Sequence, residues 1–120
     1  MIDKTAIIDP QAALGRDVSV GAYAVIEKGV QLGEKVTVSA RAHIKGNTII
    51  GDNTFIGIGA IIGEAPQMFG LTENIGSVVI GKNNIIREYV TIHASTSPER
   101  ATVLGDHNFL MAFSHVAHDC

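Results

Sequence analysis

The chain has 120 residues, the size of one domain. Hydrophobic residues make up 46% of it and charged residues 18%, so it has enough apolar material for a packed core and is not expected to be disordered. The net charge of −3 without a basic stripe excludes a nucleic-acid-binding surface, and no uncharged stretch approaches the roughly 18 residues that a membrane span requires.

Two features of the sequence bear on the cellular compartment. The opening residues, Met1 to Lys4, lack the apolar core of a secretory signal peptide. The chain has one cysteine, Cys120, which cannot form a disulfide within the chain, and this fits a reducing compartment. We therefore expect a cytoplasmic protein without a membrane span.

An internal repeat of six residues starts at Ile2. Every sixth position from there is Leu, Ile or Val in 17 of 20 cases, and the exceptions are Met68, Asn74 and Pro98. The position four residues after each aliphatic one is mostly small or β-branched, beginning with Ala6. The nine Lys and Arg and the twelve Asp and Glu residues all avoid both positions. Both positions are therefore predicted to face a core.

A period of six fits neither an α-helix nor an ordinary strand. It fits a coil with three flat sides of six residues each, with coils stacked at about 4.8 Å. We therefore predict an all-β fold, a left-handed parallel β-helix with a triangular cross-section, which occupies residues 1–120 as one domain. The chain is long enough for between six and seven such coils.

In chain order, the repeats are predicted to form three runs. The first covers 2–62, the second 80–92 and the third 104–116. Between them, external loops are predicted near 64–77 and 94–101, and each spans whole repeats. Loops on a rigid solenoid often carry function.

The fold alone leaves the function open. Hexapeptide β-helices occur in acyltransferases, in γ-type carbonic anhydrases and in plain scaffolds. Because side chains fill the interior, a site must lie outside, and the usual place is the groove between prisms of a trimer. Exposed histidines on one side are the chemistry to look for.

Three histidines stand near the C-terminal end of the sequence. His115 and His118 flank an inward Val116, Asp119 follows directly, and His93 lies about one coil earlier. All three histidines fall outside the two inward positions, so we expect them on the outer surface. A histidine beside a carboxylate is suited to take a proton from an alcohol near neutral pH. Spacing alone also permits these three histidines to bind a metal across a trimer groove.

These motifs resemble a known family. Segments 81–93, 105–111 and 115–120, which include Arg-Glu-Tyr-Val-Thr-Ile-His and His-Val-Ala-His-Asp-Cys, resemble the UDP-N-acetylglucosamine O-acyltransferases, the first enzymes of lipid A synthesis. The opening residues 1–6 are also similar, and the resemblance covers essentially the whole chain.

The resemblance implies a reaction and roles for individual residues. An acyl chain, usually 3-hydroxylated, would move from the phosphopantetheine arm of acyl carrier protein to the sugar 3-hydroxyl of UDP-N-acetylglucosamine. By this similarity His118 is the general base and Asp119 supports it, while His115, His93 and Gln67 line the acceptor site. No metal or other cofactor is implied, and the assembly is a homotrimer.

The sequence departs from the family in two ways. The family's loop commonly reads Gln-Asp-Leu-Lys, with the Asp and Lys near the acceptor sugar, and here the matching residues are Gln67, Met68, Phe69 and Gly70. A close analogue of the usual acceptor is therefore also possible. The family also continues with further coils and a C-terminal helical domain, which we expect to be absent here. The alternatives are a non-catalytic β-helix scaffold and a metal-dependent enzyme similar to γ-carbonic anhydrase.

Overall fold

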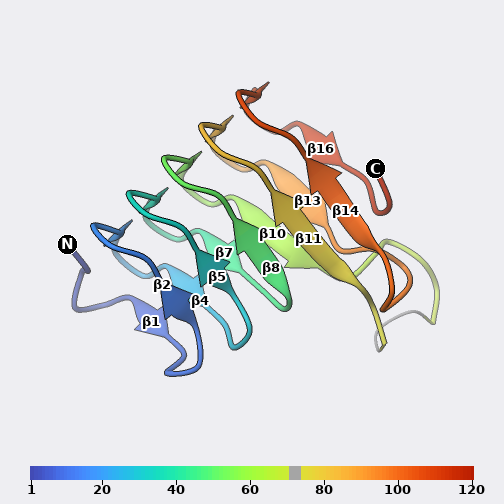
Figure 1. Ribbon diagram of the computed structural model, residues 1–120, viewed down its shortest axis with the longest axis horizontal. Helices are drawn as coiled ribbons and strands as arrows, with labels where there is room; N and C mark the ends of the chain where they lie inside the picture. Colours follow the sequence, from blue (N-terminus) through green and yellow to red (C-terminus); the bar gives the residue numbers. More distant parts are fainter. Residues whose placement is uncertain (71–73) are drawn as a thin grey trace.

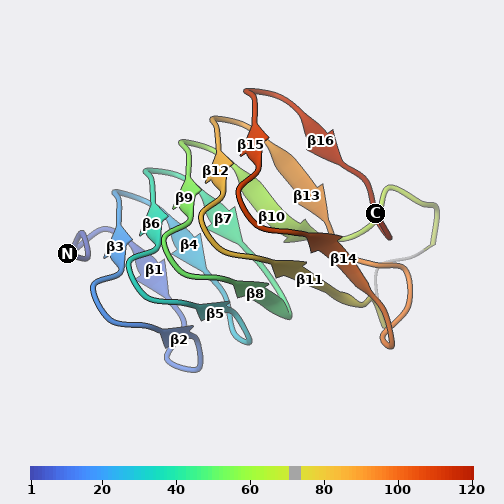
Figure 2. The ribbon, with the colours of Figure 1, turned by 45° about the horizontal axis from the view of Figure 1, so that its top comes forward.

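The structure is a computed structural model that describes residues 1–70 and 74–120. Within these residues the chain forms 16 short strands in three parallel sheets, and no helix. The sheets are the three walls of a left-handed parallel β-helix with overall dimensions of 37 × 29 × 21 Å (Figures 1 and 2). The predicted fold class is therefore confirmed.

Each wall gathers every third strand, because the chain visits the three walls in turn. Face 1 contains, in spatial order, β1 (Ile7–Ile8), β4 (Val25–Ile26), β7 (His43–Ile44), β10 (Ile61–Glu64), β13 (Thr91–His93) and β16 (His115–Val116). Face 2 contains β14 (Ala101–Leu104), β11 (Ser77–Ile80), β8 (Thr48–Ile50), β5 (Gln31–Leu32) and β2 (Ala13–Leu14). Face 3 contains β15 (Phe109–Leu110), β12 (Ile85–Ile86), β9 (Phe55–Ile56), β6 (Thr37–Val38) and β3 (Ser19–Val20).

The two inward positions of the repeat form the core. The largest fully buried side chains are aliphatic: Ile26, Ile44, Ile50, Ile56, Ile62, Ile80, Ile86, Ile92, Val30, Val36, Val38 and Val78. No Asp, Glu, Lys or Arg of the described residues is buried. Because an unpaired charge in an apolar interior is costly, the avoidance of inward positions by charged residues is explained by burial.

The strand register reveals where extra residues leave the coil. Ile26 pairs with Ile44, which is 18 residues later, but Ile62 pairs with Ile92, 30 residues later. Ile92 in turn pairs with Val116, 24 residues later. The additional residues are therefore whole repeats of six, so the aliphatic positions return to the interior after each interruption.

The additional residues form two segments at one edge of the β-helix. The chain leaves face 1 after β10 and joins face 2 at β11, and it does so again between β13 and β14. The structure describes 65–70 and 74–76 of the first segment, and 71–73 of the predicted loop near 64–77 lie outside the described residues. In both views this segment lies beside the 94–100 segment, and the Gly76 amide donates to the Ser95 carbonyl across 2.8 Å (Figures 1 and 2).

One corner, between face 3 and face 1, carries exposed aromatic side chains. Tyr89 and Phe113 both have left-handed backbones, with φ of 58° and 64°, and their rings stack at a centroid distance of 5.4 Å. The ring of Tyr89 covers Gly59 of the coil below so closely that a Cβ atom there would collide with it. Glycine is therefore required at that position of the corner.

Candidate active site

His118 and Asp119 lie together in the turn that follows β16. Nδ1 of His118 is 2.9 Å from Oδ2 of Asp119. Asp119 has a left-handed backbone with φ of 63°, a conformation that Asp tolerates better than most residues. Its amide donates to Oγ1 of the buried Thr102 across 2.9 Å, which fixes the turn against face 2.

The carboxylate of Asp119 also accepts hydrogen bonds from the 94–100 segment. Oγ of Ser95 donates to Oδ1 across 2.6 Å, and Oγ1 of Thr96 donates to Oδ2 across 2.9 Å. The amide of Thr96 points to both oxygens, at 3.4 Å and 3.3 Å. These donors lie one coil below the turn, because β13 precedes β16 in face 1.

These contacts decide which nitrogen of His118 is available as a base. The hydroxyl of Ser95, the ring of His118 and the hydroxyl and amide of Thr96 hold the pKa of Asp119 far below its usual range despite some desolvation. The carboxylate is therefore ionised near neutral pH and can only accept from Nδ1 of His118. The proton of the neutral imidazole then sits on Nδ1, and the lone pair sits on Nε2.

His93 and His115 form a second pair on neighbouring strands of face 1. Their rings meet edge to face, with centroids 4.8 Å apart and planes at 86°. Nδ1 of His115 lies 2.8 Å from Oγ1 of Thr91 and 3.3 Å from the Thr91 carbonyl. A carbonyl only accepts, so the arrangement fits a proton on Nδ1 of His115.

The prediction that His93 is a surface residue is wrong. Its side chain is only 6% exposed, and its Nδ1 has no hydrogen-bond partner among the described residues. Desolvation, followed by the nearby charges of His115 and His118, lowers the pKa of His93 although the Ala65 backbone and Glu64 act in the opposite direction. The repeat missed this burial because His93 is outside the prism interior and the start of the 65–76 segment covers it.

Glu64 and Lys45 form an ion pair beside this cluster. Nζ of Lys45 donates to both carboxylate oxygens of Glu64, at 3.0 Å and 3.1 Å. Glu64 lies opposite His93 in the register of β10 and β13. Partial burial raises the pKa of Glu64, but the hydrogen bonds from Lys45 and the Ala65 amide outweigh it, so the pKa lies below its usual value. Glu64 is therefore an anion at the edge of the histidine cluster.

The comparison with known proteins can now be set against this geometry. A protein of Thermodesulfovibrio yellowstonii named acyl-[acyl-carrier-protein]–UDP-N-acetylglucosamine O-acyltransferase is 44% identical over 120 residues, which cover 99% of this chain and 46% of that protein. A protein of Campylobacter concisus with the same name is 40% identical over 121 residues, with the same coverage. This chain is similar to the UDP-N-acetylglucosamine O-acyltransferases. The resemblance predicted from the motifs is confirmed.

Solved structures agree with these sequence relatives. A crystal structure of a UDP-N-acetylglucosamine acyltransferase superposes with a TM-score of 0.96 at 40% identity and covers 100% of this chain and 47% of that one. The Bacteroides fragilis acyltransferase gives a TM-score of 0.94 at 37% identity, over 99% of this chain and 47% of that one. No protein-family model matches the sequence. The chain thus spans about half the length of the relatives that it matches.

Gln67 differs from the other predicted acyltransferase residues in its surroundings. It is exposed, and with Met68 and Phe69 it lines a shallow hollow on the 65–70 segment itself. The structure thus groups His93, His115, His118 and Asp119, whereas Gln67 reaches this group only through Ala65, two residues earlier, whose backbone contacts His93.

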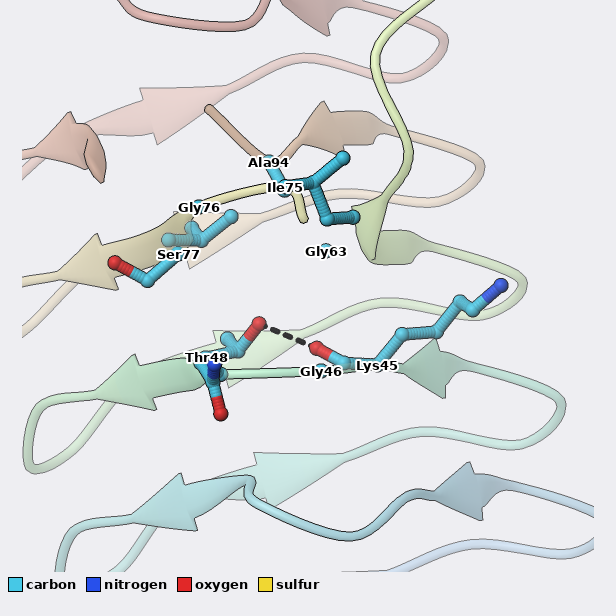
Figure 3. A pocket seen from close by; sticks show the side chains of 10 residues that line it. Lys45, Gly46, Thr48, Gly63, Ile75, Gly76, Ser77 and Ala94 are labelled. Atoms are coloured by element: carbon cyan, nitrogen blue, oxygen red, sulfur yellow. Dashed lines mark hydrogen bonds between the residues drawn. The ribbon is translucent and has the colours of Figure 1, made fainter. Parts of the chain in front are cut away.

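A small cavity lies where the 65–76 segment returns to face 2. Its volume is about 80 Å³, and its lining includes Gly63, Thr48, Ile75 and Ala94 (Figure 3). A water molecule occupies about 30 Å³ of the liquid, so the cavity has room for two or three of them and is too small for a nucleotide sugar. Substrates of an acyltransferase would therefore bind on the outer surface.

The structure also bears on metal binding and on membrane insertion. In residues 1–70 and 74–120, no three His, Cys, Asp or Glu side chains come together in a group that could hold a metal ion. The same residues contain no helix long and apolar enough to cross a membrane.

Sequence reasoning missed the residues that support Asp119. Ser95, Thr96 and Thr102 all contact it, yet hydroxyl residues are common in loops and at inward positions of this repeat. The available signal was the register: Ser95 precedes Asp119 by 24 residues, the offset that separates the paired residues of β13 and β16.

Proposed function

We propose that this chain provides the general base of an acyl-[acyl-carrier-protein]–UDP-N-acetylglucosamine O-acyltransferase. The observation that carries the proposal is the hydrogen bond between His118 and Asp119, which leaves Nε2 of His118 as the free base. The similarity of sequence and fold to acyltransferases of that name supports the assignment of the reaction class.

In the proposed reaction, Nε2 of His118 takes the proton of the sugar 3-hydroxyl while the oxygen attacks the thioester carbonyl carbon. The C–S bond breaks, the acyl group stays on the sugar oxygen, and His118 returns the proton to the departing thiol of the carrier. The imidazolium that forms in between is stabilised by the ionised carboxylate of Asp119 2.9 Å away. His115 and His93 border the same surface and are proposed to contact the acceptor.

The proposal needs no metal or redox cofactor, because a thioester is already activated and the phosphopantetheine arrives with the carrier. The acceptor is UDP-N-acetylglucosamine or a close analogue, since Met68 and Gly70 stand where the family commonly has Asp and Lys. A carrier-bound donor and the single free Cys120 are in keeping with a cytoplasmic location.

We also propose that the protein acts as a homotrimer. The outer surface of face 3 presents an apolar stripe made by the exposed side chains of Phe55, Ile85 and Phe109. It continues into the stacked aromatic corner of Tyr89 and Phe113. An exposed apolar surface of this kind marks an interaction site, and parallel packing of identical prisms would cover it.

A test of the assembly compares two strand residues of equal exposure on different faces. Phe109 on face 3 and Val103 on face 2 are each 56% exposed. We expect Phe109→Glu to convert the trimer to a monomer in light scattering, whereas Val103→Glu leaves it intact. A monomeric wild-type protein, or a trimer that survives Phe109→Glu, would refute the proposed interface.

A test of the reaction follows labelled acyl groups from acyl carrier protein to UDP-N-acetylglucosamine and locates the acylated position. Acylation of the 3-oxygen, and none with a 3-deoxy acceptor, is the expected result. A 3-amino acceptor tests the analogue: preferential N-acylation would assign the departures at Met68 and Gly70 to acceptor choice. No transfer to any of these acceptors would favour the scaffold alternative.

A further inference from the structure

Ser95 is a buried hydroxyl residue that the proposed reaction does not use. Its side chain is 0% exposed, and it lies in the 94–100 segment beneath the turn that carries His118 and Asp119. Oγ of Ser95 is 2.6 Å from Oδ1 of Asp119 and 3.3 Å from the carbonyl of Ser97. A hydroxyl has one proton, so the shorter contact, to an anion, receives it.

The backbone of Ser95 is fixed from the opposite side. Its carbonyl accepts from the Gly76 amide across 2.8 Å, and its amide donates to the Ser77 carbonyl across 3.4 Å. Gly76 packs so tightly against the carbonyls of Ser97 and Arg100 that a Cβ atom would collide with both. The serine hydroxyl therefore approaches Asp119 from a position that β11 holds in place.

The two oxygens of Asp119 have different partners. Oδ1 accepts the short bond from Ser95, while Oδ2 accepts from Nδ1 of His118 and Oγ1 of Thr96. A carboxylate held on Oδ2 alone is free to rotate about its Cβ–Cγ bond. The bond to Oδ1 removes that freedom and keeps Oδ2 directed at the imidazole.

We propose that Ser95 is a positioning residue for the base: it orients the Asp119 carboxylate and thereby fixes the His118 tautomer with its proton on Nδ1. Its catalytic consequence rests on the proposed function, but the orientation and the tautomer are properties of the chain itself and are measured without substrate.

The test uses two variants of Ser95 and a control in the same segment. Ser95→Ala removes the donor, and Ser95→Cys keeps the side-chain volume but donates weakly. Ser97→Ala is the control, because Oγ of Ser97 bonds Glu99 and does not contact Asp119. Amide spectra and melting temperatures establish that each variant is folded, and Ser95→Cys decides the question if the alanine variant is not.

The first readout is the ¹⁵N spectrum of His118 above its titration range. Wild-type protein and Ser97→Ala should show a proton on Nδ1, whereas Ser95→Ala should show a mixture with the Nε2–H tautomer and Ser95→Cys an intermediate. The second readout is the carboxyl ¹³C signal of Asp119 in acid. Loss of a donor to a carboxylate raises its pKa, so protonation should begin about one pH unit higher in Ser95→Ala.

A merely structural role would lower the melting temperature and leave both spectra unchanged, and that result would overturn the proposal. In the transfer assay we expect Ser95→Ala to lower kcat about tenfold at an unchanged KM, because fewer molecules present the free base on Nε2. Shifted spectra together with an inactive wild-type protein would support the role of Ser95 and refute the acyltransferase assignment, so the two failures are distinguishable.

Discussion

The ring of His93 meets the ring of His115 edge to face, with their centroids 4.8 Å apart, although the two residues are 22 positions apart in the chain. Parallel pairing of β13 and β16 brings them together, and the segment that follows β10 covers His93. A buried imidazole beside two other histidines favours its neutral form. This relationship links the chemistry of the site to the pH dependence of stability.

The first prediction concerns that pH dependence. The folded protein lowers the pKa of His93 below its ordinary 6.5, so the unfolded chain binds the proton first as the pH falls. Stability from this residue is therefore present above pH 6.5 and is lost as the pH falls toward the folded pKa. Between about pH 7.5 and about pH 5.5, the melting temperature of wild-type protein should fall more steeply than that of His93→Leu. Parallel curves would contradict the burial of a neutral His93.

The second prediction compares adjacent residues of β8. Ile50 points inward and is 1% exposed, whereas Ile49 points outward and is 43% exposed. Ile50→Ala should lower the free energy of unfolding by about 2–5 kcal/mol, because it leaves a cavity in a core that is continuous along the β-helix. Ile49→Ala should cost less than about 1 kcal/mol. Urea titrations of both variants measure the difference, and equal losses would contradict the assignment of the inward positions.

The third prediction compares two glycines with left-handed backbones. Gly63 has φ of 91°, and a Cβ atom there would collide with the Lys45 carbonyl and lie 2.7 Å from Oγ1 of Thr48 (Figure 3). Gly70 has φ of 76°, with nothing within 4 Å of a Cβ atom. Gly70→Ala should cost about 1–2 kcal/mol from backbone strain alone.

Gly63→Ala should cost about 1–3 kcal/mol more, because it adds overpacking to the strain. Thermal unfolding of the two variants measures this difference. Equal melting temperatures would mean that the backbone of β10 moves enough to remove the collision.

The fourth prediction concerns Asp119. Asp119→Asn keeps the size of the side chain, but its amide nitrogen can donate to Nδ1 of His118 and so favours a proton on Nε2. We expect kcat to fall at least about 100-fold with little change in KM, because the free base is lost while the acceptor surface remains. Steady-state transfer rates across the pH range measure the effect. A variant that kept the wild-type rate would show that Asp119 does not set the tautomer.

The repeat made most of the β-helix predictable from sequence. An aliphatic residue every six positions and charges excluded from two of them are direct consequences of burial, so the period alone places Ile26, Ile44 and Ile92 inside the prism, where all three are buried. The left-handed corners were less predictable. Tyr89 and Phe113 adopt φ near 60° because the stacked coils impose it, and local preference for that conformation is weak in aromatic residues.

The candidate site was predictable only in part. His118 and Asp119 are adjacent in sequence, so their pairing could be predicted from the motif. The burial of His93 and the contact of Ser95 with Asp119 depend on where the two additional segments fold back, and their sequences contain no repeat from which that could be read. Such contacts arise from tertiary packing between segments that are distant along the chain.

The most direct test of the central claim measures acyl transfer from acyl carrier protein to UDP-N-acetylglucosamine by the protein that carries this chain, with His118→Gln and His43→Gln side by side. His43 is the matched control, because it also pairs with a carboxylate, that of Glu27, on the same face but three strands away. We expect His118→Gln to lose at least about 100-fold in rate and His43→Gln to keep the wild-type rate. Wild-type activity in His118→Gln would contradict the assignment of His118 as the base.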